Sequence, residues 1–110
     1  MQIPLQISLH GIEHSDALYN AIHDKAAKLE RYYDGIISCR VVLELDARHK
    51  HKGRQFSVRI DLKVPGNEIA VTHEHGEDVQ IALRDAFDAA RRQLEDTART
   101  QRGDVKRHSA

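Results

Sequence analysis

The sequence predicts a two-layer α/β domain with the element order β-α-β-β-β-α, in which a four-stranded mixed sheet has both helices on one face. Four segments alternate apolar and polar side chains, which is typical of strands that bury one face only. Two longer segments repeat apolar residues at helical spacing, so each helix has one apolar stripe. Because each stripe needs an apolar surface to cover, both helices are expected on the buried face of the sheet.

The first strand and the first helix are separated by a change in the spacing of apolar residues. Alternation covers Ile3–His10, and helical spacing then covers Asp16 to about Tyr33. Ser15 suits the N-cap position, where its hydroxyl can accept a hydrogen bond from a free backbone N–H. Asp34-Gly35 is predicted to end the helix, because glycine readily takes the left-handed conformation that is common just after a helix.

Three more strands and a long helix complete the order. The strands are predicted at Ser38–Leu45, Gln55–Val64 and Glu68–His73, and the helix from Asp78 to about Gln101. Pro65-Gly66 fits the centre of a type II turn, where glycine accepts the positive φ. A right-handed crossover through the first helix makes the first two strands parallel if they are neighbours, and the last three strands form an antiparallel meander.

Length and composition predict one cytoplasmic domain. A chain of 110 residues suits a single hydrophobic core, and no run approaches the ~18 apolar residues that a membrane span needs. The N-terminus lacks the basic and apolar regions of a signal peptide, and the lone Cys39 cannot form an internal disulfide. We expect residues 1–102 to form the domain, residues 103–110 to be a disordered basic tail, and the free protein to be a monomer.

The charges balance over the whole chain but are unevenly distributed. There are 17 basic and 17 acidic residues, so the net charge is zero. Residues 48–63 carry six basic and one acidic side chain, whereas residues 64–98 carry three basic and eight acidic ones. A protein that coats nucleic acid by bulk charge would be more basic. Any nucleic-acid contact must therefore come from local patches of basic residues. The low net charge weakens the hypothesis that the chain binds RNA.

The sequence predicts no enzyme and no cofactor. Cys39 falls on the buried side of its strand, where a cysteine is usually an inert small hydrophobic residue. The chain has no nucleophile elbow, no phosphate-cradling glycine loop and no paired-carboxylate motif. We therefore expect a binding protein without a small-molecule substrate.

The eight histidines raise a metal-binding alternative. His49 and His51 alternate within one segment, and His73 and His75 flank Glu74, so each pair could place two imidazoles on the same side of a strand. The first pair lies among four cations that would repel a metal ion, and the chain has no Cys/His spacing of a structural zinc site. The sequence therefore predicts no metal site, although a His-rich metal-binding protein remains an alternative.

Basic side chains on the two predicted helices are candidates for contacts with nucleic acid. On the first helix they recur at three-residue steps along one flank, beside the buried stripe. On the last helix a projection at about 100° per residue places several carboxylates and six basic residues opposite the apolar stripe, namely Arg84, Arg91, Arg92, Arg99, Arg102 and Lys106. A solvated, ion-paired helix surface is the alternative interpretation. The six predicted contact residues are Lys25, Lys28, Arg31, Arg84, Arg91 and Arg92.

A second basic group lies between the second and third predicted strands. It is expected to form a hairpin loop that either contacts phosphates or only increases solubility. No aromatic residue interleaves with these cations, so the sequence does not predict base stacking of the kind used on single strands. The cations of this secondary loop are Arg48, Lys50, Lys52 and Arg54.

Three segments in register resemble a known family. Gln6–Gly11, Lys25–Tyr32 and Asp78–Leu94 resemble the bacterial ribosome hibernation-promoting factors and ribosome-associated inhibitors, and the resemblance covers residues 2 to about 102. It implies the same β-α-β-β-β-α order and a fold similar to the double-stranded-RNA-binding fold. Because the sequence ends at Ala110, it resembles a short-form member without the C-terminal domain by which long members dimerise ribosomes.

The resemblance also implies a function in stationary phase. Members bind small-subunit rRNA where messenger RNA and transfer RNA would bind, and they silence idle ribosomes. Lys25, Lys28 and Arg31 match the basic positions of the first-helix motif, and Arg92 matches the basic residue before Gln-Leu. Arg84 and Arg91 come from the helical projection instead.

Two points leave the function open at this stage. Ala89, Glu95 and Asp96 stand on the last helix where the family often has lysines, which implies weaker RNA contacts. Members of the family have also been labelled sigma-54 modulation proteins. A protein-interaction regulator of an alternative sigma factor is therefore a second hypothesis, beside the metal-binding alternative.

Overall fold

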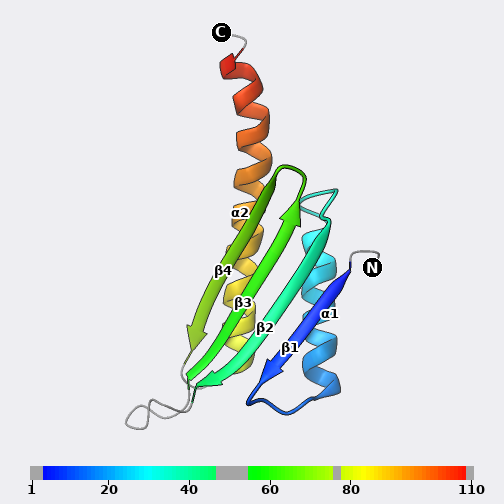
Figure 1. The fold of residues 1–110 in the computed structure, drawn as a ribbon, viewed down its shortest axis with the longest axis vertical. Coiled ribbons are helices and arrows are strands. Elements are labelled where there is room, and N and C mark those ends of the chain that lie inside the picture. The colour runs from blue at the N-terminus through cyan, green and yellow to red at the C-terminus, as the bar shows by residue number, and fades with distance from the viewer. Residues whose placement is uncertain (1–3, 47–54, 76–77, 109–110) are drawn as a thin grey trace.

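The computed structural model describes residues 4–46, 55–75 and 78–108 and confirms the predicted order of elements (Figure 1). Three of the four strands lie close to their predicted bounds, and the fourth is longer than predicted. The elements are β1 (Leu5–His10), α1 (Asp16–Leu29), β2 (Ser38–Asp46), β3 (Gln55–Val64), β4 (Asn67–His75) and α2 (Val79–His108).

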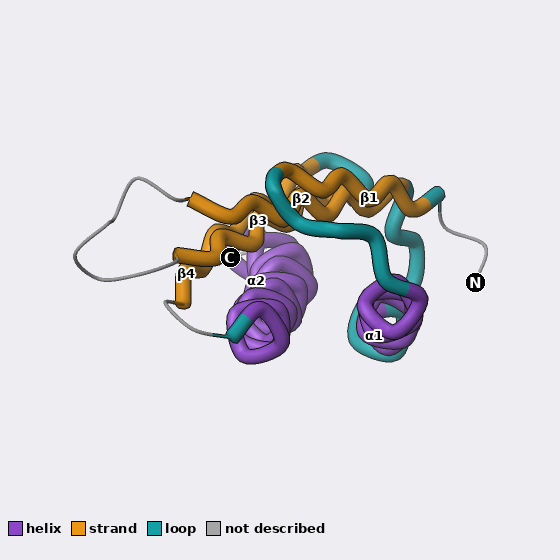
Figure 2. The backbone as a smooth tube through the Cα atoms, turned by 90° about the horizontal axis from the view of Figure 1, so that it is seen from below, coloured by secondary structure: helices purple, strands orange, loops and turns teal. Residues whose placement is uncertain are grey.

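The four strands form one mixed sheet in the order β1-β2-β3-β4. β1 pairs with β2 in parallel, and the two remaining pairs are antiparallel, as the crossover and the meander predict. Gly66 has a φ of 77°, which fits the predicted turn between β3 and β4. Figure 2 shows α1 and α2 on the same side of the sheet, so the predicted two-layer arrangement is confirmed.

One hydrophobic core lies between the sheet and the two helices. The alternating strand residues and both helical stripes meet there, and no buried polar side chain is found among the described residues. Cys39 belongs to this core with 2% of its surface exposed, as the strand phase predicts. The largest fully buried side chains are Ile22, Leu43, Ile60, Leu62, Leu83, Leu94, Val41, Val58 and Val64.

Strand alternation puts Phe56 in phase with Val58 and Ile60 and so predicts it in the core, but it is only half-buried. It lies at the start of β3 and lines an open pocket of about 450 Å³ together with Leu18, Leu45 and Val79. These residues lie near the ends of their strands and helices, where fewer neighbouring side chains cover them. Strand alternation gives the side of the sheet on which a residue lies, but it does not show where along the strand the helices stop covering it.

The first helix ends earlier than its apolar stripe predicts. α1 ends at Leu29, with Ser15 as its N-cap, and the following backbone N–H groups bond to carbonyls three residues back. Tyr32 N–H, for example, donates to the Leu29 carbonyl at 3.0 Å. Tyr33 continues the stripe from this turn and packs, half-buried, against the core. Gly35 has the predicted positive φ, 106°, but it lies in the loop beyond the helix.

The last helix ends later than predicted. α2 continues to His108, past the end near Gln101 that its apolar stripe indicates. Figure 1 shows its C-terminal part extending beyond the sheet. Backbone hydrogen bonds close within a helix, and this segment has no proline, so an apolar stripe is not needed for helical geometry. The disorder predicted for residues 103–110 stays a prediction about behaviour in solution.

Candidate nucleic-acid interface

A groove with a volume of about 170 Å³ lies between the two helices. α1 and α2 run side by side under the sheet (Figure 2), so residues far apart in the sequence line opposite walls. Four of the six predicted contact residues meet here, two from each helix. Arg84 and Arg91 were predicted opposite the apolar stripe of α2, but they lie beside it, next to the buried Phe87. The lining residues are Lys25, Lys28, Leu29, Tyr32, Arg84, Phe87, Asp88 and Arg91.

The groove has an apolar floor and charged walls. Leu29 and Phe87 are 3% and 5% exposed, so they form the floor as part of the core. Long basic side chains can lay their alkyl stems along such a floor and keep their charged ends in water. Lys25 and Arg91 are half-buried, whereas Lys28 and Arg84 are exposed, which fits this arrangement.

The cations of the groove are only partly neutralised. Among the described residues, Lys25 and Lys28 have no ion-pair partner. Arg84 Nε lies 3.3 Å from Asp85 Oδ1, and Arg91 Nε lies 3.6 Å from Glu95 Oε1, but neither carboxylate lines the groove. Asp88 is the single acidic residue in the lining, against four basic ones. The result is a local basic site in a protein of zero net charge.

Tyr32 belongs to this site, although sequence reasoning missed it. The Arg91 guanidinium carbon lies 5.4 Å from the centre of the Tyr32 ring, within the range of a cation–π contact. Tyr32 nevertheless keeps 43% of its surface exposed. Its position four residues after Lys28 could have indicated that it follows the basic flank of the first helix. The groove thus combines cations with an aromatic ring, a combination that the sequence of the secondary basic loop does not contain.

Arg31 and Arg92 lie outside the groove lining. Arg31 is exposed in the turn after α1, because the helix ends before it. Arg92 is exposed on α2 and is turned by about 100° around the helix axis from Arg91. The predicted secondary loop with Arg48, Lys50, Lys52 and Arg54 lies outside the described residues.

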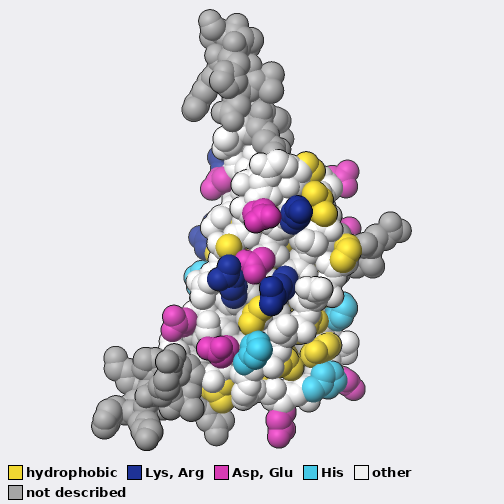
Figure 3. All heavy atoms as spheres, in the orientation of Figure 1, with side chains coloured by type: hydrophobic (Ala, Val, Ile, Leu, Met, Phe, Trp, Pro, Cys, Tyr) yellow, Lys and Arg dark blue, Asp and Glu magenta, His cyan; other side chains and the backbone are white. Residues whose placement is uncertain are grey.

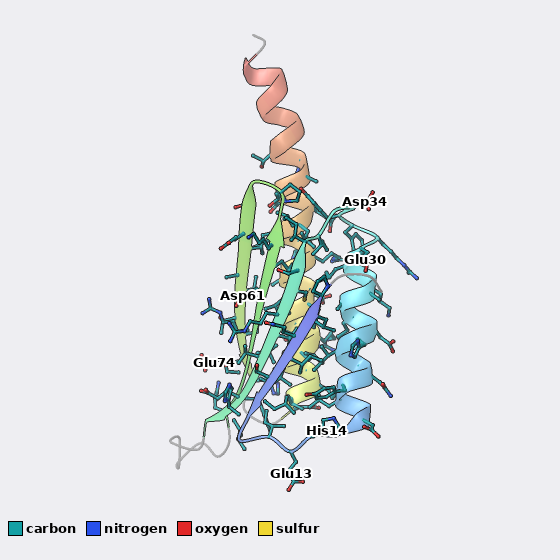
Figure 4. The ribbon with its side chains drawn as sticks, turned by 45° about the vertical axis from the view of Figure 1, so that its right-hand side comes forward. Glu13, His14, Glu30, Asp34, Asp61 and Glu74 are labelled. Carbon is teal, nitrogen blue, oxygen red and sulfur yellow. The ribbon has the colours of Figure 1, made fainter. Side chains whose placement is uncertain are left out.

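The outer face of the sheet also carries basic residues, but most are mixed with acidic ones. Figure 3 shows blue and magenta side chains close together across this face. Arg59 Nε donates to both carboxylate oxygens of Asp61, at 3.1 and 3.2 Å. Gln55 Nε2 donates to Glu74 Oε2 at 3.1 Å. In Figure 4, Asp61 and Glu74 point away from the helices, and so away from the groove.

The described residues give no support to a metal site or a reactive thiol. They contain no group of three or more His, Cys, Asp or Glu side chains that could hold a metal ion. His75 Nδ1 accepts a hydrogen bond from the Asp78 backbone N–H at 3.2 Å, which gives that histidine a structural role before α2. His49 and His51 lie outside the described residues. Burial, with a smaller contribution from Asp61, raises the pKa of Cys39 to about 12.

No helix in the described part of the chain is long and apolar enough to cross a membrane.

Comparison with protein families gives a match over residues 5–102, to the family described as sigma 54 modulation protein / S30EA ribosomal protein. A ribosome hibernation promotion factor of Deinococcus radiodurans is 35% identical over 95 residues, covering 86% of this chain and 48% of that one. A ribosome hibernation promoting factor of Azotobacter vinelandii is 32% identical over 90 residues, covering 82% and 78%. This chain thus spans about half the length of the Deinococcus relative.

Solved structures show the same fold. The N-terminal domain of Thermus thermophilus Protein Y has a TM-score of 0.73 and 25% identity, with 86% of this chain and 99% of that chain covered. A ribosomal subunit interface protein from Coxiella burnetii has a TM-score of 0.75 and 18% identity, with 87% and 98% covered. At that lower identity, the second likeness bears on the fold alone.

Proposed function

Because this chain belongs to the sigma 54 modulation protein / S30EA ribosomal protein family, we propose that it is a ribosome-associated hibernation factor. In this proposal it binds small-subunit rRNA near the sites of messenger RNA and transfer RNA and silences idle ribosomes. The names of the Deinococcus and Azotobacter relatives support the hibernation role. The observation that carries the proposal for this chain is the basic groove between α1 and α2.

The proposed contact is with RNA phosphates and does not depend on sequence. Lysine and arginine side chains release counterions when they neutralise phosphates, and such contacts position a protein without reading bases. Lys25, Lys28 and Arg84 would make them from both walls of the groove. Arg31 and Arg92 are exposed on either side and would extend the contact surface.

Inhibition in this proposal follows from occlusion. A rigid domain held at the small subunit would exclude other ligands from the same space, with no chemical step. Shape complementarity to folded RNA would supply the specificity that a neutral protein cannot obtain from bulk charge. The proposed similarity to the double-stranded-RNA-binding fold fits this mode of recognition, in which shape outweighs sequence.

The test is co-sedimentation. Purified protein is mixed with small ribosomal subunits, and the mixture is centrifuged through a sucrose gradient over a series of salt concentrations. We expect the protein to travel with the subunits at low salt and to dissociate progressively as salt rises. A companion assay asks whether bound protein prevents messenger RNA and transfer RNA from binding. Protein that stays at the top of the gradient at low salt would refute the proposal.

A second candidate comes from the family description, which also names sigma 54 modulation. Such a regulator would bind a protein partner and would not need the groove cations. A charge-neutralised groove therefore separates the two candidates, since it should release ribosomes and leave a sigma-factor complex intact.

A further inference from the structure

We propose that the groove between α1 and α2 holds one unpaired nucleotide, with its base stacked on Tyr32 and its phosphate among Lys25, Lys28 and Arg84. This inference rests on the proposed function and specifies what that function would recognise. It treats the site as a reader of single-stranded RNA, whereas phosphate contacts alone would suit any nucleic-acid backbone.

The environment of Tyr32 supplies the stacking surface. The Arg91 guanidinium lies 5.4 Å from the ring centre and fixes one side of the ring, and 43% of the residue remains exposed. Arg91 Nε also lies 3.6 Å from Glu95 Oε1, an i,i+4 ion pair on the same helix. Proteins that bind single strands stack the bases on exposed aromatic rings that lie among cations. Such stacking accepts any base, because every base has a π-face.

The charges around the ring are arranged for one phosphate. Lys25 and Lys28 have no ion-pair partner among the described residues, so their ammonium groups are available to an anion. Asp88 is exposed in the same lining, and its negative charge limits how many phosphates the groove can hold. A carboxylate there can instead accept a hydrogen bond from an N–H group on a base edge.

The size of the groove favours an unpaired nucleotide over a duplex. Its volume is about 170 Å³, so part of one nucleotide fits inside it while the rest lies at its open mouth, whereas a segment of double helix is too wide to enter. In a duplex the base faces are covered by their neighbours, so they could not stack on Tyr32. A nucleotide in a loop, a bulge or a strand end can turn its base outward and reach the ring.

The experiment compares two substitutions of the same residue. Tyr32→Phe removes the hydroxyl but keeps the ring beneath the Arg91 guanidinium, whereas Tyr32→Leu removes the stacking surface. Tyr19→Leu is the matched control, because Tyr19 packs against His14 and is not part of the groove lining. Affinity for purified small ribosomal subunits is measured for all four proteins, and thermal unfolding confirms that each is folded.

We expect Tyr32→Leu to weaken binding by ~5- to ~150-fold, the range that base–aromatic stacking provides, and Tyr32→Phe and Tyr19→Leu to bind like the parent. A second readout uses NMR signals of the Tyr32 ring during titration with oligouridylate, with an abasic oligomer of the same length, and with an RNA duplex. The ring signals should shift most with oligouridylate, because the other two probes can bring a phosphate to the groove but no base to the ring.

The outcomes separate this inference from the proposed function. If the parent does not bind small subunits at all, the proposed function fails and this inference fails with it. If the parent binds but Tyr32→Leu binds equally well, only the stacking inference is refuted. Equal shifts of the Tyr32 ring signals with oligouridylate and with the abasic oligomer would also refute it, because no base would then contact the ring.

Discussion

The groove and the outer face of the sheet use the same kinds of charged residues, but they pair them differently. Four basic side chains and one acidic side chain line the groove. A shallow hollow on the sheet is lined by Arg40, Arg59 and Lys63 together with Asp61 and Glu68. On the sheet Arg59 is engaged by both oxygens of Asp61, whereas the two groove lysines have no partner among the described residues.

The second difference is the surface beneath the charges. The groove has Leu29 and Phe87 as a buried apolar floor and Tyr32 at its side, and no aromatic residue lines the hollow on the described part of the sheet. Free cations over an apolar and aromatic surface can bind both the phosphate and the base of a nucleotide. The number of charged residues on a surface therefore predicts binding poorly unless their ion-pair partners are also known.

The largest expected effect is on ribosome binding when the groove is stripped of its positive charges. Replacing Lys25, Lys28, Arg84 and Arg91 by glutamine should weaken binding to small subunits on the order of 1,000-fold, at about 1 kcal/mol for each cation removed. The slope of log affinity against log salt should fall by roughly 0.7 to 0.9 for each phosphate that the variant no longer neutralises. Co-sedimentation over a salt series measures both quantities.

The matched control neutralises the sheet face. Arg40→Gln, Arg59→Gln and Lys63→Gln together should leave the affinity within about twofold, because these cations lie on the opposite layer and one of them is already paired. If the sheet-face variant fails to bind and the groove variant still binds, the candidate site is on the wrong face.

The next largest effect is a loss of folding stability when a residue of the apolar groove floor is truncated. Leu29→Ala should lower the free energy of unfolding by about 3 kcal/mol, because Leu29 is 3% exposed and its removal leaves a cavity. Val42→Ala, at a half-buried position on the outer sheet face, should cost about 1 kcal/mol or less. Urea unfolding measures both. Equal losses of stability would mean that the two faces are equally packed.

A smaller effect is the pH dependence of folding stability. It arises from the buried Cys39, whose pKa is influenced by Asp61 on the sheet face. In the folded protein the pKa of Cys39 is raised to about 12 from 9.0 by burial and, to a lesser extent, by Asp61. The unfolded thiol therefore ionises first, and the pH dependence from this group begins about one unit below the unfolded pKa, near pH 8. Above that pH, stability should fall by at most about 1.4 kcal/mol per pH unit until the folded pKa is reached.

The measurement for Cys39 is urea unfolding of the parent and of Cys39→Ala between about pH 8 and pH 10.5. The difference in stability between the two proteins should shrink or reverse as the pH rises. Parallel curves over this range would show that the thiol is not protected by the core.

The smallest effect is expected from breaking the ion pair on the sheet. Asp61→Asn removes the partner of Arg59, but the Arg59 and Asp61 side chains are 57% and 34% exposed. The stability should therefore change by less than about 1 kcal/mol, and ribosome binding should not change. The same variant should lower the pKa of Cys39, which thiol titration in the folded state would detect. A large gain in ribosome binding would show that the sheet face contacts RNA once its cations are free.

Much of the fold could be predicted because its signals are local. The alternation in β1 to β4 assigns each side chain to one face, and this places Cys39 inside and Arg59 outside without knowledge of any other element. The errors lie at the ends of elements, at Tyr33, Phe56 and beyond Gln101. At each of these points burial or helical geometry depends on what packs there, and the spacing of apolar residues does not contain that information.

The candidate site divides in the same way. Helical periodicity alone predicts that Lys25 and Lys28 share a flank of one helix and that Arg84 and Arg91 share a side of another, because periodicity is a property of neighbouring residues. It does not predict that these two sides face each other, that Arg91 packs on Tyr32, or that Arg92 stays outside. These contacts arise because α1 and α2 are separated in the chain by three strands, and the pairing of those strands lays both helices side by side on one sheet.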